Sequence, residues 1–248
     1  MLYVFGDSYV KSDSRPDWSY LSLVQKELDI PEQNFGLVGS SLDYTFARFE
    51  EQRNNFVEGD IILITLTVQE KVTFFPDRPT LSHSVMSRHF FGTVDHTNEE
   101  KQAMQAYFKH LHNPEIVGIN VINFLHSVND ITQKKKLHTV VLNSIAHDFD
   151  SLVVQERFPA IHLAKGCLAD PTKAEISDQD LFNFFEFQMY TNDPRPFHYS
   201  KENHRILADS IISSIKHNTA IDLETIFKKN IFGRDQFREY MMLLANKS

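Results

Sequence analysis

The run Ile-Ile-Leu-Ile-Thr-Leu at residues 61–66 limits the possible folds of this chain more than any other feature. Its apolar residues fall on both odd and even positions, so both faces of a strand formed here would have to be covered. Strands of that kind are typical of parallel sheets, in which crossover helices cover the faces. The run therefore predicts an α/β fold around a mostly parallel sheet.

The remaining sequence alternates between strand-like and helix-like segments. In the first helical segment, apolar residues at 18, 21, 24 and 28 follow helical spacing, and Asp17 is a candidate N-cap. We expect strands at 2–5, 34–38, 61–66, 139–145 and 160–163, and helices at 17–28, 42–56, 99–130 (with a break at Asn113-Pro114), 177–187 and 201–216. This alternation predicts a three-layer α/β sandwich of the flavodoxin-like type.

Residues 68–97 interrupt this alternation and show no clear period. Loops of this length without regular structure are usually lids or binding loops, so Phe74, Phe75, Phe90 and Phe91 are candidates for the wall of a pocket or for packing beneath the loop. We predict one domain over residues 1–220 that contains this insertion. Residues 221–248 should form a C-terminal helical extension that packs on the same domain.

Composition excludes several classes of function. The 248 residues carry a net charge of −8 with scattered Lys and Arg, which argues against a nucleic-acid partner. The single cysteine, Cys167, excludes an internal disulfide and suits a small buried side chain. No transmembrane segment or signal peptide is recognisable, so we expect a cytoplasmic protein without a membrane partner. The 21 phenylalanines predict a core of large aromatic side chains. The oligomeric state is not indicated.

The tripeptide Gly6-Asp7-Ser8 follows the first expected strand directly. A serine just beyond the C-terminal end of a strand lies where open α/β sheets place their active sites. Gly6 allows a tight turn, and Asp7 can brace it through backbone hydrogen bonds. The alternative is an ordinary Gly-Asp-Ser turn without a function.

A second group of residues stands near the C-terminus. A loop with prolines at 194 and 196 leads to His198, and Ser200 is a plausible N-cap for the helix that follows. A histidine placed there, after the last strand, would lie at the same edge of the sheet as Ser8. A serine and its base need only meet in space, so their separation along the chain is no obstacle.

These segments together resemble the SGNH (GDSL-type) hydrolases, a family of esterases and lipases. The first block of that family matches Phe5-Gly6-Asp7-Ser8, and the second, Asn-x-x-x-x-Gly, matches residues 34–39. The last block, a histidine that enters a helix, matches the segment from His198 to Ala208. The resemblance covers roughly residues 1–66 and 190–215; the middle of the chain and its C-terminal tail match by pattern only.

The resemblance implies a role for each matched residue. Ser8 would be the nucleophile, His198 the base, and the backbone N–H groups of Ser8 and Gly39 would hold the oxyanion. Tyr9, beside the serine, could shape the pocket or stack on a sugar, and Asp7 belongs to the same segment. No metal or cofactor is required.

The chain departs from the family at two positions. The third block, Gly-x-Asn-Asp, supplies an oxyanion donor from its Asn, but here the strand runs into Thr65-Leu66-Thr67-Val68-Gln69. Thr67 and Gln69 are the alternative donors. The family's triad Asp stands three residues before the histidine, where this chain has Arg195. Asp193 is the nearest candidate, and the alternatives are a backbone carbonyl of the Pro-rich loop or a carboxylate from elsewhere in the chain.

We therefore expect a serine esterase that hydrolyses a small acyl ester, such as an O-acetyl carbohydrate, through an acyl-enzyme. The alternative is a non-catalytic module on the same fold that binds a carbohydrate or a protein. A flavodoxin-like domain with an unrelated function is a remote third possibility, since no phosphate loop follows the first strand.

Overall fold

A computed structural model describes residues 1–10, 17–37, 40–67, 98–144, 155–168 and 201–228. The chain divides into two compact units: Met1–Ser12 with Pro31–Leu163, and Asp13–Ile30 with Ala164–Ser248. The expected helix at 177–187, the insertion at 68–97, Ser200 and most of the C-terminal extension lie outside the described residues. The predicted boundaries of the hydrolase-like domain and of its extension therefore remain predictions.

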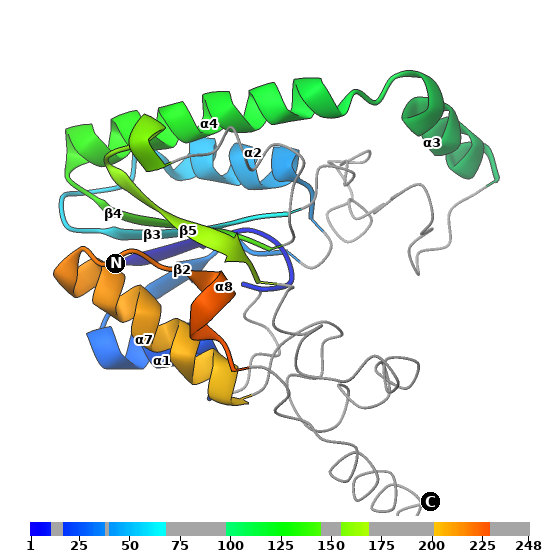
Figure 1. Cartoon of the computed structure of the whole chain (residues 1–248). Helices are drawn as coiled ribbons and strands as arrows, with labels where there is room; N and C mark the ends of the chain where they lie inside the picture. The colour runs from blue at the N-terminus through cyan, green and yellow to red at the C-terminus, as the bar shows by residue number, and fades with distance from the viewer. Residues whose placement is uncertain (11–16, 38–39, 68–97, 145–154, 169–200, 229–248) are drawn as a thin grey trace, which may run out of the picture. The chain divides into compact units, whose positions relative to one another are not determined.

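Five strands form one sheet (Figure 1). They are β1 (Leu2–Phe5), β2 (Glu32–Asn34), β3 (Ile61–Leu66), β4 (His138–Asn143) and β5 (Ile161–Cys167). Their order is β2-β1-β3-β4-β5, and the pairs β1–β2, β1–β3 and β3–β4 are parallel. This is the strand order of flavodoxin-like folds, so the predicted α/β class with a parallel sheet is confirmed.

The helices of the first unit begin and end at residues suited to those positions. They are α2 (Leu42–Gln52), α3 (Asn98–His110) and α4 (Pro114–Lys135). The hydroxyl of Ser41 caps α2 by accepting a hydrogen bond from the Tyr44 N–H, and the Asn113 side chain caps α4 just before Pro114. The predicted break at Asn113-Pro114 therefore separates α3 from α4.

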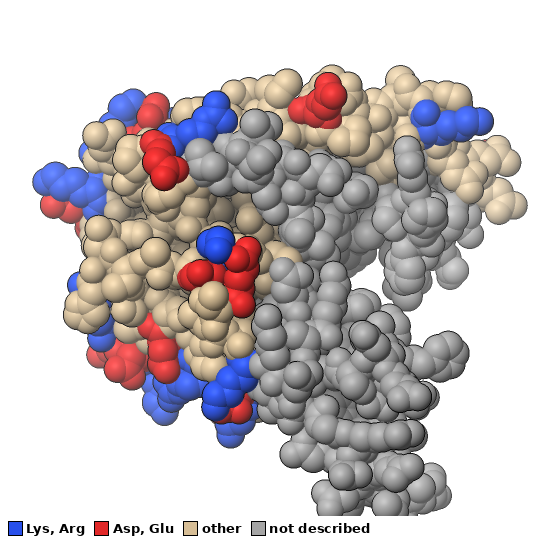
Figure 2. Space-filling model, in the orientation of Figure 1, with Lys and Arg blue, Asp and Glu red and all other residues tan. Residues whose placement is uncertain are grey.

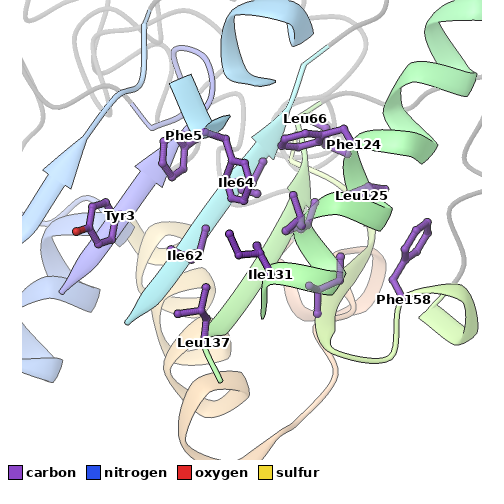
Figure 3. Close-up of a cluster of buried hydrophobic side chains, with 14 of the residues drawn as sticks. Tyr3, Phe5, Ile62, Ile64, Leu66, Phe124, Leu125, Ile131, Leu137 and Phe158 are labelled. Atoms are coloured by element: carbon purple, nitrogen blue, oxygen red, sulfur yellow. The ribbon is translucent and has the colours of Figure 1, made fainter. Parts of the chain in front are cut away.

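A cluster of buried side chains fills the space between the sheet and the helices α2 and α4 (Figure 3). The cluster includes side chains of β1, β3 and α4 (Figure 3), namely Tyr3, Phe5, Ile62, Ile64, Leu66, Phe124, Leu125 and Ile131. Aromatic rings contribute much of this packing. Phe5 stacks on Phe35 with a centroid distance of 5.1 Å and meets Phe49 edge-on at 5.6 Å. The aromatic core predicted from the phenylalanine content is thus present.

The second unit contains α1 (Tyr20–Leu28) packed against α7 (Lys201–His217), followed by α8 (Leu223–Ile226) (Figure 1). His204 of α7 is buried, and its Nδ1 accepts a hydrogen bond from the Tyr20 N–H at 3.1 Å. The proton of the neutral ring is therefore assigned to Nε2. His204, which matches part of the last family block, links the start of α1 to α7.

Several predicted boundaries differ from the structure. The helix expected at 42–56 ends at Gln52, the helix expected to end at 130 continues to Lys135, and the strand expected at 160–163 continues to Cys167. The N-cap of α1 is Ser19 rather than Asp17, because the Ser19 hydroxyl accepts the hydrogen bond from the Ser22 N–H. The strand predicted at 34–38 is β2 at Glu32–Asn34. After β2, the Phe35 N–H still donates to β1, at the Val4 carbonyl, and the Leu37 N–H donates to Gly6 just beyond β1. Between them, Asn34 Oδ1 accepts from the Gly36 N–H and bends the chain away from regular strand geometry.

Acidic and basic side chains are interspersed on the face of the molecule that Figure 2 shows. Some of them pair along a helix, as Arg48 does with Glu51 of α2 at 2.6 Å. Exposed pairs of this kind contribute about 0.3–0.5 kcal/mol each. In the described part of the chain, no helix is both long enough and apolar enough to cross a membrane. Cys167 is buried, as predicted.

Candidate active site

The sheet topology places the carboxyl end of β1 at the point where the strand order reverses. β2 lies on one side of β1 and β3 lies on the other. In open α/β sheets, ligands bind outside the carboxyl ends of the strands at such a switch point. The turn that carries Ser8 follows β1, and Thr67 follows β3. Residues from both sides of the switch point can therefore contribute to one site.

A side chain at position 6 would force the neighbouring atoms of Thr65 to move. The φ of Gly6 is +146°, and an ideal Cβ at this position would lie 1.8 Å from Thr65 Oγ1. The space that a side chain would need is thus filled by a hydroxyl of β3, which also accepts a hydrogen bond from the Asp7 N–H at 3.4 Å. The glycine allows β1 and β3 to approach closely just before the serine.

Asp7 braces the turn, as the sequence indicates. The side chain is buried, and its Oδ1 accepts a hydrogen bond from the Tyr9 N–H at 3.1 Å. The Asp7 carbonyl accepts another from the Val10 N–H at 3.2 Å. Ser8 is partly exposed between buried neighbours. Tyr9 is only 4% exposed, so its ring packs inside the protein, and the predicted stacking on a sugar remains a prediction.

The segment after β2 is bonded to the serine turn at several points. Asn34 Nδ2 donates to the Val10 carbonyl at 2.6 Å, and the Leu37 N–H and the Ser40 hydroxyl both donate to the Gly6 carbonyl at 3.0 Å. The first and second blocks of the motif are thus joined by direct hydrogen bonds. Sequence reasoning missed the contacts of Asn34 and Ser40. The only available signal was the Asn-x-Gly spacing, which favours a turn.

Thr67 is a buried polar residue at the end of β3. Its side chain is 0% exposed, and Oγ1 has no hydrogen-bond partner among the described residues. A buried hydroxyl without a partner costs about 1–3 kcal/mol, so such groups are rare and often functional. Ser144 holds the backbone just before Thr67, because its N–H and its hydroxyl both donate to the Leu66 carbonyl, at 2.8 and 2.9 Å.

The other predicted site residues, namely Gly39, Gln69, Asp193 and His198, lie outside the described residues. The structure therefore brings together the serine turn, Leu37 and Ser40 of the segment after β2, and the end of β3. Within the described ranges, no group of three or more His, Cys, Asp or Glu side chains is placed to hold a metal ion.

These features define an α/β protein of flavodoxin-like strand order, with a Gly-Asp-Ser turn at its topological switch point. No family model and no curated protein matches the chain. The chain is similar in fold to a carbohydrate esterase whose active site displays divergent catalytic and non-catalytic binding functions. The identity is 12% and the TM-score 0.44, over 87% of this chain and 68% of that chain.

Two other solved structures are similar to the same degree. A member of the lipolytic G-D-S-L family from Veillonella parvula DSM 2008 is 12% identical with a TM-score of 0.41, over 88% of this chain and 97% of that one. Protein YXIM from Bacillus subtilis is 12% identical with a TM-score of 0.48, over 88% of this chain and 56% of that one. These similarities concern the fold alone.

Proposed function

We propose that the chain is a serine ester hydrolase with Ser8 as its nucleophile. The observation that carries this proposal is the position of the partly exposed Ser8 in a braced turn at the switch point, two residues after a glycine at which a side chain would clash with Thr65. The motif resemblance assigns this serine the attack on an acyl carbon.

In the proposed reaction, the Ser8 hydroxyl attacks the ester carbonyl while His198 takes its proton. The tetrahedral oxyanion is held by the N–H groups of Ser8 and Gly39 and by the Thr67 hydroxyl. Collapse of this intermediate breaks the bond to the alcohol, which leaves with the proton from His198. Water then attacks the acyl-enzyme, again with His198 as the base, and releases the acid and Ser8.

Thr67 is proposed as the third oxyanion donor in preference to Gln69. The support is its buried Oγ1, which has no partner among the described residues and so retains a hydroxyl proton to donate. The substrate is proposed to be a small acyl ester, with an O-acetyl carbohydrate as one example. No metal ion or cofactor takes part in these steps.

A binding module without catalysis is the second candidate. It is favoured by the two departures from the family, which are Thr67 with Gln69 in the third block and Arg195 in place of the triad Asp. In that case Ser8 would contact a carbohydrate or a protein without attacking it.

Replacement of Ser8 by alanine distinguishes the two candidates. We expect Ser8→Ala to abolish p-nitrophenyl acetate hydrolysis and labelling by a fluorophosphonate probe, with a melting temperature close to that of the wild type. Peptide mapping of the labelled wild-type protein should locate the probe on Ser8. A wild-type protein that neither turns over the ester nor takes up the probe would favour the binding module.

A further inference from the structure

One peptide group in the serine turn is hydrogen-bonded at both of its polar atoms. This is the group between Gly6 and Asp7. Its carbonyl oxygen accepts from the Leu37 N–H and from the Ser40 hydroxyl, each at 3.0 Å. Its N–H donates to Thr65 Oγ1 at 3.4 Å. The partners come from both sides of β1, because Leu37 and Ser40 follow β2 whereas Thr65 belongs to β3.

The bond from Ser40 is not needed to satisfy the Gly6 carbonyl. That oxygen keeps the backbone bond from Leu37 when the hydroxyl is removed, so no acceptor is left without a partner. Ser40 is nevertheless only 1% exposed and directs its hydroxyl at this oxygen. Its specific contribution is therefore to restrict the orientation of the peptide group.

The orientation of the Gly6–Asp7 group matters for the proposed reaction because the next peptide group carries the Ser8 N–H. Rotation of the first group turns the second and displaces both an oxyanion donor and the nucleophile. Ser40 also directly follows Gly39, the second backbone donor. The hydrogen bond from the Ser40 hydroxyl to the Gly6 carbonyl therefore joins the segment after β2 to the turn that carries Ser8. Displacements of about 1 Å at a reacting centre can reduce rates about a hundredfold.

We infer that Ser40 and Thr65 are positioning residues, whose hydroxyls hold the Gly6–Asp7 peptide group so that the Ser8 N–H faces the oxyanion of the proposed reaction. This inference rests on the proposed function. Neither hydroxyl touches the substrate. Both act through the backbone that carries the donors.

The test measures kcat, KM and melting temperature with p-nitrophenyl acetate for two matched pairs of variants. The first pair is Ser40→Ala and Ser41→Ala. Both serines are 1% exposed, but the Ser41 hydroxyl caps α2 and does not bond to the Gly6 carbonyl. We expect Ser40→Ala to lower kcat about tenfold or more with KM changed less than about twofold, as for an interaction that matters in the transition state. Ser41→Ala should lower the melting temperature and leave kcat within about twofold.

The second pair keeps the inference testable if Ser40→Ala does not fold. Thr65→Val retains the shape of the side chain and removes the hydroxyl, whereas Thr65→Ser retains the hydroxyl. We expect Thr65→Ser to keep a kcat at least about fivefold higher than that of Thr65→Val, on the scale of an oriented hydrogen bond. Equal kcat values in this pair, or a Ser40→Ala kcat within twofold of the wild type, would overturn the inference while Ser8-dependent turnover persists. Wild-type turnover equal to that of Ser8→Ala would instead overturn the proposed function, and this inference with it.

Discussion

The serine turn shows which contacts can be predicted from a residue type and which cannot. The roles of Gly6 and Asp7 follow from their chemistry, since glycine tolerates a positive φ and aspartate accepts from the N–H two residues ahead. The contacts of Thr65 and Ser40 with this turn could not be predicted. They join residues 58 and 34 positions apart, and only the register of the sheet brings them together.

Thr67 gives the first prediction at this scale. Thr67→Val keeps the volume and removes the hydroxyl, so it should lower kcat by about a hundredfold if Oγ1 donates to the oxyanion. It should also leave stability equal or improved, because the buried Oγ1 has no partner among the described residues. Gln69→Leu is the matched variant and should have a smaller effect. The reverse ranking of the two kcat values would assign the donor role to Gln69.

The partner of His198 gives a second prediction. A neutral histidine accepts the serine proton at Nε2 when Nδ1–H faces an acceptor, which we propose is the Asp193 carboxylate. Asp193→Asn should then reduce kcat about a hundredfold or more and alter the pH profile, on the scale known for triad carboxylates. Glu202→Gln, in the first turn of α7, is a control for the loss of one negative charge. Wild-type turnover and pH dependence in Asp193→Asn would indicate a Ser-His dyad or another acceptor.

At the scale of the elements, the positions of apolar strands and of helix breaks could be predicted better than the bounds of the short strand β2. The strands at 2–5 and 61–66 lie where their apolar residues indicate, and the Asn113-Pro114 break separates two helices. β2 was placed two residues too late because it is a short strand with few apolar residues, Glu32–Asn34, and is held mainly by its backbone pairing with β1. Backbone pairing does not depend on the residue type, so it cannot be predicted from the apolar pattern of the sequence.

Lys135 shows how one helix stabilises the end of another. Its ammonium group, at the last residue of α4, donates to the carbonyls of Arg53, Asn54 and Phe56, at 2.9, 3.3 and 2.7 Å. These carbonyls follow the C-terminus of α2, where unpaired acceptors and the helix dipole favour a cation.

Lys135→Met retains the apolar stem and removes the charge. We expect it to lower the free energy of unfolding by about 1–2 kcal/mol, since hydrogen bonds to charged groups are worth more than neutral ones. Urea denaturation measures the change. Lys134→Met, at an exposed lysine of the same helix, should stay within about 0.5 kcal/mol of the wild type. Equal effects of the two substitutions would show that the contacts with residues 53–56 do not stabilise the protein.

At the scale of the whole molecule, the sequence predicted the class of the fold because a parallel sheet imposes its pattern on every strand. Buried strands such as 61–66 need helices to cover both of their faces, so strand-like and helix-like segments alternate along the sequence. The strand order β2-β1-β3-β4-β5 then placed the Ser8 turn at the switch point without any information about the substrate. The acyl group and the alcohol of the proposed ester substrate could not be predicted in this way, because no periodic pattern determines the positions of loop side chains.

The stability of the molecule should depend on pH through a partly buried histidine of β5. His162 of β5 is partly buried, and burial lowers its pKa from the ordinary value of 6.5; the charge of His138 on β4 lowers it further. Below about pH 6.5 the unfolded chain therefore binds a proton that the folded protein resists. The free energy of unfolding should fall as the pH decreases from 6.5 toward the lower pKa of the folded state, and level off below it.

His162→Gln removes this titration and keeps a polar side chain of similar size. Urea denaturation at several pH values should therefore give a shallower fall in the free energy of unfolding below about pH 6.5 for the variant than for the wild type. At pH 8, where neither state binds the proton, the pH-linked part of the difference should vanish. His217→Gln, at an exposed histidine near the end of α7, is the control and should keep the wild-type slope. If His162→Gln and the wild type lose stability in parallel as the pH falls, the acid sensitivity arises from other groups.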